Sequence, residues 1–230
     1  MVNWFPLESN PEVLTTYSKA LGLKSSYVFS DLVALEDWAF GMLPGKCEAV
    51  VFLYSLSQPQ REYHDNFIPT EGRDSTSSLF RVQQNVGNAC GTIGVLHSVG
   101  SVRSKYSDCL EEGSWFETFF NKCEGKTGAE NGATLESDEE IETKHTSAAN
   151  SAANSSAQVA SADSNVNEHF VAFVEHNGGV YEMDGRRGGG EGLFHGKGEL
   201  SEVVGRVCQE YMGRDPNSNK FSLVALCKCD

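Results

Sequence analysis

The spacing of apolar positions predicts helices in five parts of the chain. Residues 8–22 carry the clearest signals, because Ser9 or Asn10 can cap the start of a helix there. Pro11 suits the first helical position and Gly22 suits the end. The other four helical patterns cover residues 31–42, 90–102, 111–122 and 200–213.

Three segments have the apolar content and the length of strands. Residues 49–56 (AVVFLYSL) are apolar almost throughout, which predicts a strand buried on both faces. Residues 169–186 (HFVAFVEHNGGVYEMDGR) alternate on either side of Asn177-Gly178, the strongest hairpin signal in the chain. The end of the chain, KFSLVALCKCD, predicts a further strand. This mixture of helices and strands indicates one layered domain of α/β or α+β class over residues 1–230.

Two polar stretches interrupt these elements. Residues 57–80 contain two prolines and are expected to form a long connection. Residues 146–167 (TSAANSAANSSAQVASADSNVN) consist mainly of Ser, Ala and Asn, so they are expected to form a mobile loop. Long loops in compact domains are often functional, as lids or gates, but a neutral surface insertion fits this composition equally well.

Size and charge narrow the class of protein. A chain of 230 residues with 39% hydrophobic content can bury one substantial core. The net charge of −14 disfavours nucleic acid as a partner, because phosphate binding needs clustered Lys and Arg. The acidic charge favours a basic ligand or protein partner, or it merely confers solubility.

The N-terminus and the cysteines bear on location. The first residues, MVNWFPLESNPEVL, lack the basic and apolar regions of a secretory leader, and no window approaches a membrane span. We therefore expect a soluble protein that is not secreted and does not bind membranes. Seven cysteines without dense, regular spacing argue against a disulfide framework and favour a reduced compartment, the cytosol or the nucleus.

Cys90 is the first candidate for chemistry. If Asn88 caps a helix that starts at Ala89, Cys90 lies in the first turn, where unpaired N–H groups and the helix dipole favour a thiolate. Gly91 and Gly94 would leave one side of this helix start open to a substrate backbone. On these residues alone, a buried cysteine that only fills space is the alternative.

A nucleophilic cysteine needs a base, and the six histidines differ in their suitability. His97 follows Cys90 on the same helix by seven residues, about 10 Å along the axis, so it is expected in the core. His169 and His176 flank the strand FVAFVE. The others lie in polar or glycine-rich connections, where a solvated surface position is expected: His64, His145 and His195.

The hairpin selects His169. With a two-residue turn at Asn177-Gly178, Asp184 lies opposite Val171 and is the diagonal neighbour of His169 on the same face of the sheet. A three-residue turn would instead move Asp184 to the other face. The two-residue turn therefore predicts contact between His169 and Asp184.

These residues form a candidate Cys-His-Asp triad, with Cys90 as nucleophile, His169 as base and Asp184 orienting the imidazole. The developing oxyanion needs donors, and the backbone N–H of Cys90 can supply one. A second could come from the side-chain amide of Gln83 or Gln84, and chemistry alone does not choose between them. A core cysteine with an unrelated His/Asp pair is the alternative.

The remaining cysteines raise the question of a metal. Cys227, Cys229 and Cys208 have no fourth ligand at the spacing of a structural zinc site. We therefore expect no metal and no organic cofactor, and we interpret these cysteines as strand-end thiols.

Four blocks of the sequence resemble the ubiquitin C-terminal hydrolase family, which are cysteine peptidases of papain-like fold. The blocks are WFPLESNPEV (residues 4–13), QNVGNACGTIGVLHSV (84–99), NEHFVAFVEHNGGVYEMDGR (167–186) and GRDP (213–216). The likeness covers essentially the whole chain. It implies a central antiparallel sheet flanked by helices and a knotted backbone, a rare topology.

The resemblance also implies a site and an activity. Cys90 would be the nucleophile, His169 the general base and acid, Asp184 the orienting acid and Gln84 the oxyanion-hole glutamine. Residues from about 144 to 166 fall where the family has its active-site crossover loop. The implied activity is thiol-dependent hydrolysis of small adducts or short peptides from the C-terminal glycine of ubiquitin, through an acyl-enzyme.

The implied partner is ubiquitin, and we expect the enzyme to be a monomer. Glu8, Glu12 and Asp31 would meet basic residues of the ubiquitin tail, with Leu7 and Pro6 nearby for apolar contact. One alternative is the same chemistry on a ubiquitin-like protein. Another is a monoubiquitin-binding module without turnover, which the presence of all four catalytic residues disfavours.

Overall fold

The sheet lies at the centre of the molecule. The computed structural model describes residues 3–66, 79–151, 167–187 and 192–230. Within these ranges six antiparallel strands follow the order β1-β6-β2-β3-β4-β5. They are β1 (Tyr27–Asp31), β2 (Lys46–Ser55), β3 (Glu168–His176), β4 (Gly179–Met183), β5 (Leu193–Lys197) and β6 (Ser222–Lys228). The expected mixed fold with a central antiparallel sheet is confirmed, whereas the knotted backbone stays a prediction.

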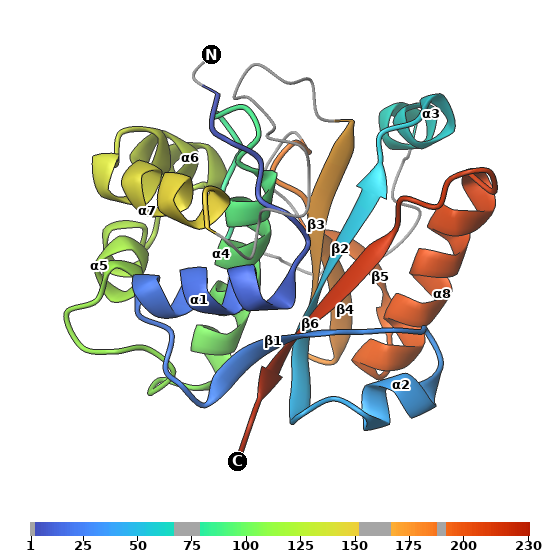
Figure 1. Ribbon diagram of the computed structural model, residues 1–230, viewed down its shortest axis with the longest axis horizontal. Coiled ribbons are helices and arrows are strands. Elements are labelled where there is room, and N and C mark those ends of the chain that lie inside the picture. The colour runs from blue at the N-terminus through green and yellow to red at the C-terminus, as the bar shows by residue number, and fades with distance from the viewer. Residues whose placement is uncertain (1–2, 67–78, 152–166, 188–191) are drawn as a thin grey trace.

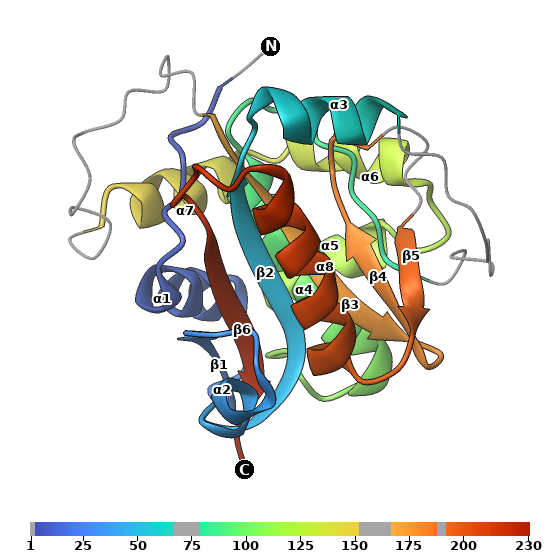
Figure 2. The same cartoon turned by 90° about the vertical axis from the view of Figure 1, so that its right-hand side faces the viewer.

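Helices cover both faces of the sheet (Figures 1 and 2). One layer comprises α1 (Pro11–Leu21), α4 (Cys90–Lys105), α5 (Trp115–Lys122), α6 (Gly128–Glu136) and α7 (Glu139–Ala149). The other comprises α2 (Asp37–Gly41), α3 (Gln58–Asn66) and α8 (Leu200–Arg214). No helix in the described part of the chain has the length and apolar content needed to cross a bilayer.

Strand β2 connects two hydrophobic cores, as its apolar run predicts. Ala49 and Val51 belong to the core under α4, and Val50 and Phe52 to the core under α8. Helix α4 packs on β2 and β3 and is buried on all sides from its first residue to Val102, because its apolar and small residues surround the axis.

Residues at their own ends or turns determine α1 and the hairpin of β3 and β4, the two elements that the sequence predicts most directly. Asn10 caps α1 by accepting hydrogen bonds from two backbone N–H groups, and Gly22 ends it in a left-handed conformation with φ 106°. The hairpin turns at Asn177 and Gly178, both at positive φ, so Ala172 pairs with Met183 as predicted.

Two predictions for the first third of the chain are wrong. Residues 31–42 form only the short α2, because Asp31 ends strand β1 and the pairing with β6 continues through the Leu32 N–H to the carbonyl of Leu223. The connection expected over residues 57–80 contains α3, whose buried Gln60 donates to the carbonyl of Tyr211 on α8 at 2.7 Å.

The middle of the chain is also more ordered than its composition suggests. Helices α6 and α7 lie in a segment without aromatic residues, and a Thr127/Glu130 capping box and an Asp138 cap begin them. The predicted helix over 111–122 begins only at Trp115, and β5 was not predicted. The first residues of the expected crossover loop, 144–149, are helical and belong to α7. Residues 152–166 lie outside the described ranges, so the crossover loop stays a prediction.

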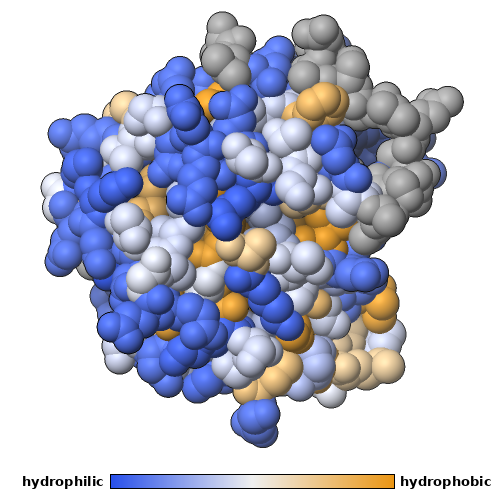
Figure 3. Space-filling model, turned by 60° about the vertical axis from the view of Figure 1, so that its left-hand side comes forward, coloured by the Kyte–Doolittle hydropathy of each residue, from blue (hydrophilic) through white to orange (hydrophobic). Residues whose placement is uncertain are grey.

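The surface on the side of this helical layer is largely hydrophilic, with apolar areas that are small and separate (Figure 3). In the described part of the chain, the large hydrophobic side chains that are exposed are Val33, Trp38 and Met42, around α2. The other large apolar side chains of the described residues are buried or partly buried, so the two cores account for most of the hydrophobic content.

Candidate active site

Cys90 is the first residue of α4, and its side chain is buried. The helix begins one residue later than predicted, because Ala89 rather than Asn88 is its N-cap residue. Asn88 adopts φ 60° and its side-chain amide donates to the carbonyl of Trp4 at 3.1 Å, so it ties the N-terminal segment to the helix start. Cys90 keeps the first-turn position that the sequence predicts.

The two glycines after Cys90 do not leave an open surface, contrary to expectation. A Cβ on Gly91 would lie 3.0 Å from Cβ of Leu7, and one on Gly94 would lie 3.4 Å from Cγ1 of Val51. Gly91 lets the N-terminal segment pack closely against the start of α4, whereas a Cβ on Gly94 would make an ordinary contact with β2.

His169 and Asp184 meet as the hairpin register predicts. His169 Nε2 and Asp184 Oδ1 are 2.7 Å apart, and the side chains are 1% and 6% exposed. The backbone N–H of Arg186 also donates to Oδ1 at 2.8 Å and holds the carboxylate in place. Because Asp184 binds Nε2, Nδ1 is the ring nitrogen left for Cys90, and in the described ranges no group other than Cys90 interacts with it.

The charges of the three residues support one another. Burial raises the pKa of Asp184, but the charge and the hydrogen bond of His169 outweigh burial and hold this pKa well below its ordinary value. Burial lowers the pKa of His169, but Asp184 and then Cys90 outweigh it, so the pKa is raised. Burial raises the pKa of Cys90, yet the interactions with His169 and with the Phe170 backbone leave it lowered. The triad therefore favours a thiolate beside an imidazolium.

The other cysteines provide a contrast. All seven cysteines are free. Burial raises the pKa of Cys47 and Cys227 to about 12, and that of Cys109 and Cys123 to about 11. Such thiols are poor nucleophiles at neutral pH, so the chemistry points to Cys90.

Gln84 lies beside the triad. Its backbone N–H donates to the carbonyl of Gly185 at 2.8 Å, and its Nε2 donates to the carbonyl of Val86 at 3.0 Å. A Cβ on Gly185 would lie 2.7 Å from Cγ2 of Ile93, so only glycine lets the turn after Asp184 approach α4 this closely. The carbonyl of Gln83, the other candidate, packs against α6, where a Cβ on Gly132 would lie 2.3 Å from it.

His97 is in the core, as expected. It is 3% exposed, and its Nε2 accepts a hydrogen bond from the Val82 N–H at 3.1 Å. Burial lowers the pKa of His97 to about 4, so it stays neutral and takes no part in proton transfer at neutral pH.

His145 was expected on the surface, and that expectation is wrong. Its side chain is fully buried, with Nε2 2.5 Å from the carbonyl of Phe5 and Nδ1 2.7 Å from Oγ1 of Thr92. A carbonyl only accepts, so Nε2 carries the proton and the Thr92 hydroxyl donates to Nδ1. Tyr17 then donates to Thr92 at 2.8 Å, and this chain of bonds joins α1, α4 and α7 two residues after Cys90.

The sequence does contain a signal for this position. Ile141, His145 and Ala149 recur at a spacing of four and form the buried stripe of α7. Burial lowers the pKa of His145 to about 4, as expected for a neutral histidine in a core.

His64 and His195 were also expected on the surface and instead belong to a buried polar network around Glu182. The Glu182 carboxylate, 0% exposed, accepts from Arg187 Nη2 at 2.7 Å, from His195 Nε2 at 2.9 Å and from the Tyr211 hydroxyl at 3.1 Å. Burial raises its pKa, but His195 and then Arg187 outweigh burial and lower it to about 2. His64 bonds to both Arg187 and the Tyr54 hydroxyl.

This network is the one group in the described ranges that resembles a metal site. Potential ligand atoms of His64, Glu182 and Asp184 lie within 4.8 Å of one another. The guanidinium of Arg187 already donates to Glu182 at 2.7 Å and to His64 Nδ1 at 3.3 Å. A second cation beside Arg187 would be repelled, so these residues do not fit a metal ion.

The expected ubiquitin-contacting residues lie in and next to one surface depression. Glu12 and Asp31, both exposed, line a depression of about 440 Å³ between α1 and β1. Glu8 and Pro6 are half-buried. Leu7 is only 5% exposed and packs against Gly91, so it supports the site from within the core more than it offers an apolar surface.

Comparisons with known proteins show which family the chain resembles. A family model described as ubiquitin carboxyl-terminal hydrolase, family 1, matches residues 4–213. A probable ubiquitin carboxyl-terminal hydrolase of Dictyostelium discoideum is 32% identical and covers 98% of this chain and 88% of its own. A ubiquitin carboxyl-terminal hydrolase of Drosophila melanogaster is 33% identical, with 98% of each chain covered.

A solved structure shares the fold. The catalytic domain of Trichinella spiralis UCH37, bound to ubiquitin vinyl methyl ester, aligns with a TM-score of 0.79 over 98% of this chain and 96% of that chain. The sequence identity is 21%, so this likeness establishes the architecture.

Proposed function

The chain belongs to family 1 of the ubiquitin carboxyl-terminal hydrolases, and on that basis we propose that it hydrolyses the bond after the C-terminal glycine of ubiquitin. Members of this family are thiol-dependent hydrolases. The observation that carries the proposal is the arrangement of His169, whose Nε2 is bound to Asp184 while Nδ1 is left for a Cys90 thiol of lowered pKa.

The proposed mechanism has two steps. The Cys90 thiolate attacks the glycine carbonyl, a sulfur–carbon bond forms, and His169 gives its proton to the leaving amine or thiol as the bond to it breaks. A water molecule then loses a proton to His169 and attacks the acyl-enzyme, which releases ubiquitin and restores the Cys90 thiolate. No metal or organic cofactor enters either step.

The oxyanion requires donors that are in place before the reaction. The Cys90 N–H is one of the unpaired N–H groups at the start of α4. Gln84 Nε2 carries two hydrogens and uses one on the Val86 carbonyl, which leaves the other for the oxyanion. Removing such a donor typically costs about 10²- to 10³-fold in kcat.

The proposed contact with ubiquitin rests on charge and shape. The ubiquitin tail contains arginine and ends in Gly-Gly, and Glu12 and Asp31 give the depression beside α1 a negative charge. Glu8, Pro6 and Leu7 belong to the segment that leads from this depression toward Cys90. A narrow path would accept residues without side chains and reject ordinary peptides by shape.

Two further properties are part of the proposal. Seven free cysteines suit a reducing compartment, so we place the enzyme in the cytosol or the nucleus. The burial of most large apolar side chains in two cores, and the largely hydrophilic face seen in Figure 3, support a monomer.

The test uses ubiquitin that carries a thiol-reactive electrophile at its C-terminus, followed by intact mass measurement and peptide mapping. We expect a covalent adduct on Cys90 and no adduct on the Cys90→Ser variant. A matching probe built on a ubiquitin-like protein ranks that alternative by the ratio of labelling rates. Binding of unreactive ubiquitin without labelling would reject the hydrolase and support a module that only binds ubiquitin.

A further inference from the structure

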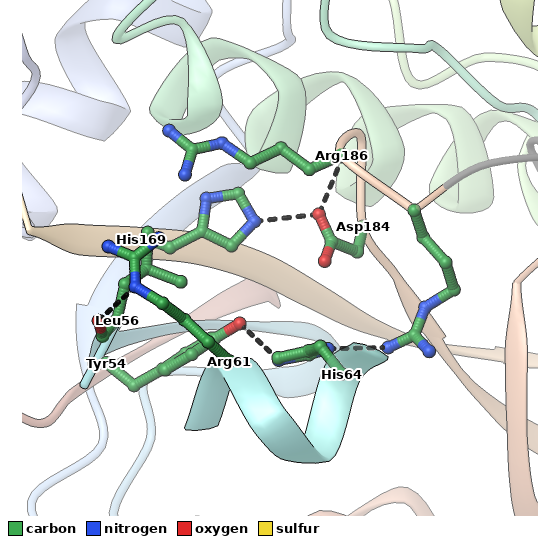
Figure 4. Close-up of a pocket in the computed structure, with 8 residues that line it drawn as sticks. Tyr54, Leu56, Arg61, His64, His169, Asp184 and Arg186 are labelled. Atoms are coloured by element: carbon green, nitrogen blue, oxygen red, sulfur yellow. Dashed lines mark hydrogen bonds and ion pairs between the residues drawn. The ribbon is translucent and has the colours of Figure 1, made fainter. Parts of the chain in front are cut away.

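A second cavity adjoins the catalytic pair on the side of α3. It has a volume of about 340 Å³, and His169 and Asp184 form part of its wall. Three arginines line it as well: Arg61 of α3, and Arg186 and Arg187 of the turn that follows Asp184. In Figure 4, Arg186 extends over the His169 ring, and Arg61 rises from α3 on the other side of the cavity.

The positive charge in this cavity is only partly neutralised. Arg187 pairs with the buried Glu182, and Asp184 pairs with His169. The Nε of Arg61 donates to the neutral carbonyl of Leu56 at 2.8 Å. Within the described ranges, neither Arg61 nor Arg186 has an ion pair with a carboxylate. Among the described residues, two guanidinium groups without a carboxylate partner therefore face one cavity in a chain of net charge −14.

The position of the cavity indicates which part of a substrate would reach it. His169 must give a proton to the leaving amine or thiol, so the leaving group lies on the His169 side of Cys90. The acidic depression proposed for the ubiquitin tail lies beside β1, at one edge of the sheet. The arginine-lined cavity lies farther along the sheet, where α3 and the ends of β2, β3 and β4 meet beside His169, so it is on the leaving-group side.

We propose that this cavity is a subsite for the leaving group and binds a carboxylate close to the scissile bond. The inference rests on the proposed function and deepens it. The favoured substrates are ubiquitin adducts whose amine component carries an acidic residue directly after the ubiquitin glycine. Guanidinium groups suit this ligand because they bind carboxylates through paired N–H donors. The carboxylate takes no part in bond making or breaking.

The test compares three substrates that differ in one residue. Ubiquitin is extended at its C-terminus by Glu-Gly, Gln-Gly or Lys-Gly, and kcat/KM is measured for each at low salt and at about 0.5 M salt, where exposed charges are largely screened. An exposed ion pair contributes up to about fivefold. Two arginines should thus favour the Glu substrate over its Gln isostere by about 5- to 20-fold at low salt, and the preference should shrink at high salt.

Variants of the arginines test whether the preference for the Glu substrate arises in this cavity. Because Arg186 also influences Cys90, the quantity compared is the Glu/Gln ratio of kcat/KM within each variant, from which any change in the chemical step cancels. The double variant Arg61→Gln/Arg186→Gln should bring the ratio to within about twofold of one. The control Arg206→Gln, on α8 and paired with Glu210, should keep the wild-type ratio.

The possible outcomes separate the two proposals. A wild-type ratio near one, with the Gln substrate turned over, overturns the subsite and leaves the proposed hydrolase intact. A ratio that survives in the double variant, or a preference for Lys, also overturns the subsite. Failure to cleave any of the three substrates rejects the proposed function and the subsite with it.

Discussion

The buried Glu182 offers a direct test of what holds the turn at Asp184 in place. The perturbation is Glu182→Gln, which keeps the shape of the side chain and removes its charge. Glu182 lies two residues before Asp184 on the same face of β4, and its carboxylate accepts hydrogen bonds from Arg187, His195 and Tyr211. The variant leaves Arg187 with a buried charge and no carboxylate at 2.7 Å.

The expected loss of stability follows from two independent arguments. The pKa of Glu182 is about 2 in the folded protein against an ordinary 4.5. At about 1.4 kcal/mol per unit, this difference amounts to about 3 kcal/mol. Removing one partner of a buried ion pair costs about 3–5 kcal/mol, and the 19% exposure of the Arg187 side chain places the cost at the lower end. We therefore expect a loss of about 3 kcal/mol in the free energy of unfolding at pH 7.

The pH dependence gives the sign of the effect. The pKa of Glu182 is lower in the folded than in the unfolded state, so its contribution is fully present above about 4.5 and is lost as the pH falls toward 2. The difference between wild type and Glu182→Gln should be constant from pH 8 to 5 and should shrink below that range.

The assay is urea unfolding of both proteins over this pH range, with extrapolation to water. Glu175→Gln on the neighbouring β3 is the matched control, because Glu175 is 39% exposed and pairs with Lys105 at 3.3 Å. The control should cost less than about 1 kcal/mol. If the two variants lose equal stability, the buried carboxylate does not hold this network together and the reasoning fails.

Three further predictions concern proton transfer, acid stability and close packing. Asp184→Asn removes the main influence that raises the pKa of His169, so the alkaline limb of the pH profile of kcat/KM should move to lower pH; an unchanged limb would contradict the assignment. The pKa of His145 is about 4 in the folded protein and 6.5 ordinarily, so the wild type should lose stability as the pH falls from 6.5 to 4. In urea unfolding over this range, the loss should be about 3 kcal/mol smaller for His145→Gln. Gly132→Ala should lower the free energy of unfolding by about 1–3 kcal/mol, because its Cβ would lie 2.3 Å from a carbonyl oxygen. Gly213→Ala, with open space around it, should raise the free energy of unfolding by about 0.5–1 kcal/mol. Equal shifts of the melting temperature in the two variants would refute this contrast.

The parts of the fold that could be predicted are those set by neighbouring residues. Asn10 and Gly22 define α1 through its own backbone, and Asn177-Gly178 defines the hairpin through two backbone angles. Residues 31–42 show the opposite case, because Asp31 ends a strand that is held by β6, nearly 200 residues away. Helix α7 lies between these cases, because the Asp138 cap and the four-residue spacing of Ile141, His145 and Ala149 are visible in the sequence, although the segment contains few large apolar residues.

In the candidate site, too, some contacts follow from neighbouring residues and others only from the packing of distant elements. The sequence predicts that Asp184 lies beside His169, because side chains alternate between the two faces of a hairpin and the length of the turn alone then decides which residues share a face. The same rule puts Glu182 on the face of Asp184, so its buried position was within reach of the sequence. The partners of Glu182 were not, because His64, Arg187 and Tyr211 come together only through the packing of α3 and α8 against the sheet.

The two proposals together give the site a direction. In the proposed arrangement, Glu12 and Asp31 make the ubiquitin side of Cys90 negative, and Arg61 and Arg186 make the leaving-group side positive. A basic tail is attracted to one end of such a site and an anionic leaving group to the other, so a substrate that enters in reverse meets like charge at both ends. The net charge of −14 is a property of the whole chain and does not describe the site, where negative and positive side chains lie at opposite ends. Since salt screens exposed charges at these distances, substrate capture should weaken with ionic strength at both ends, whereas the buried His169–Asp184 pair should not.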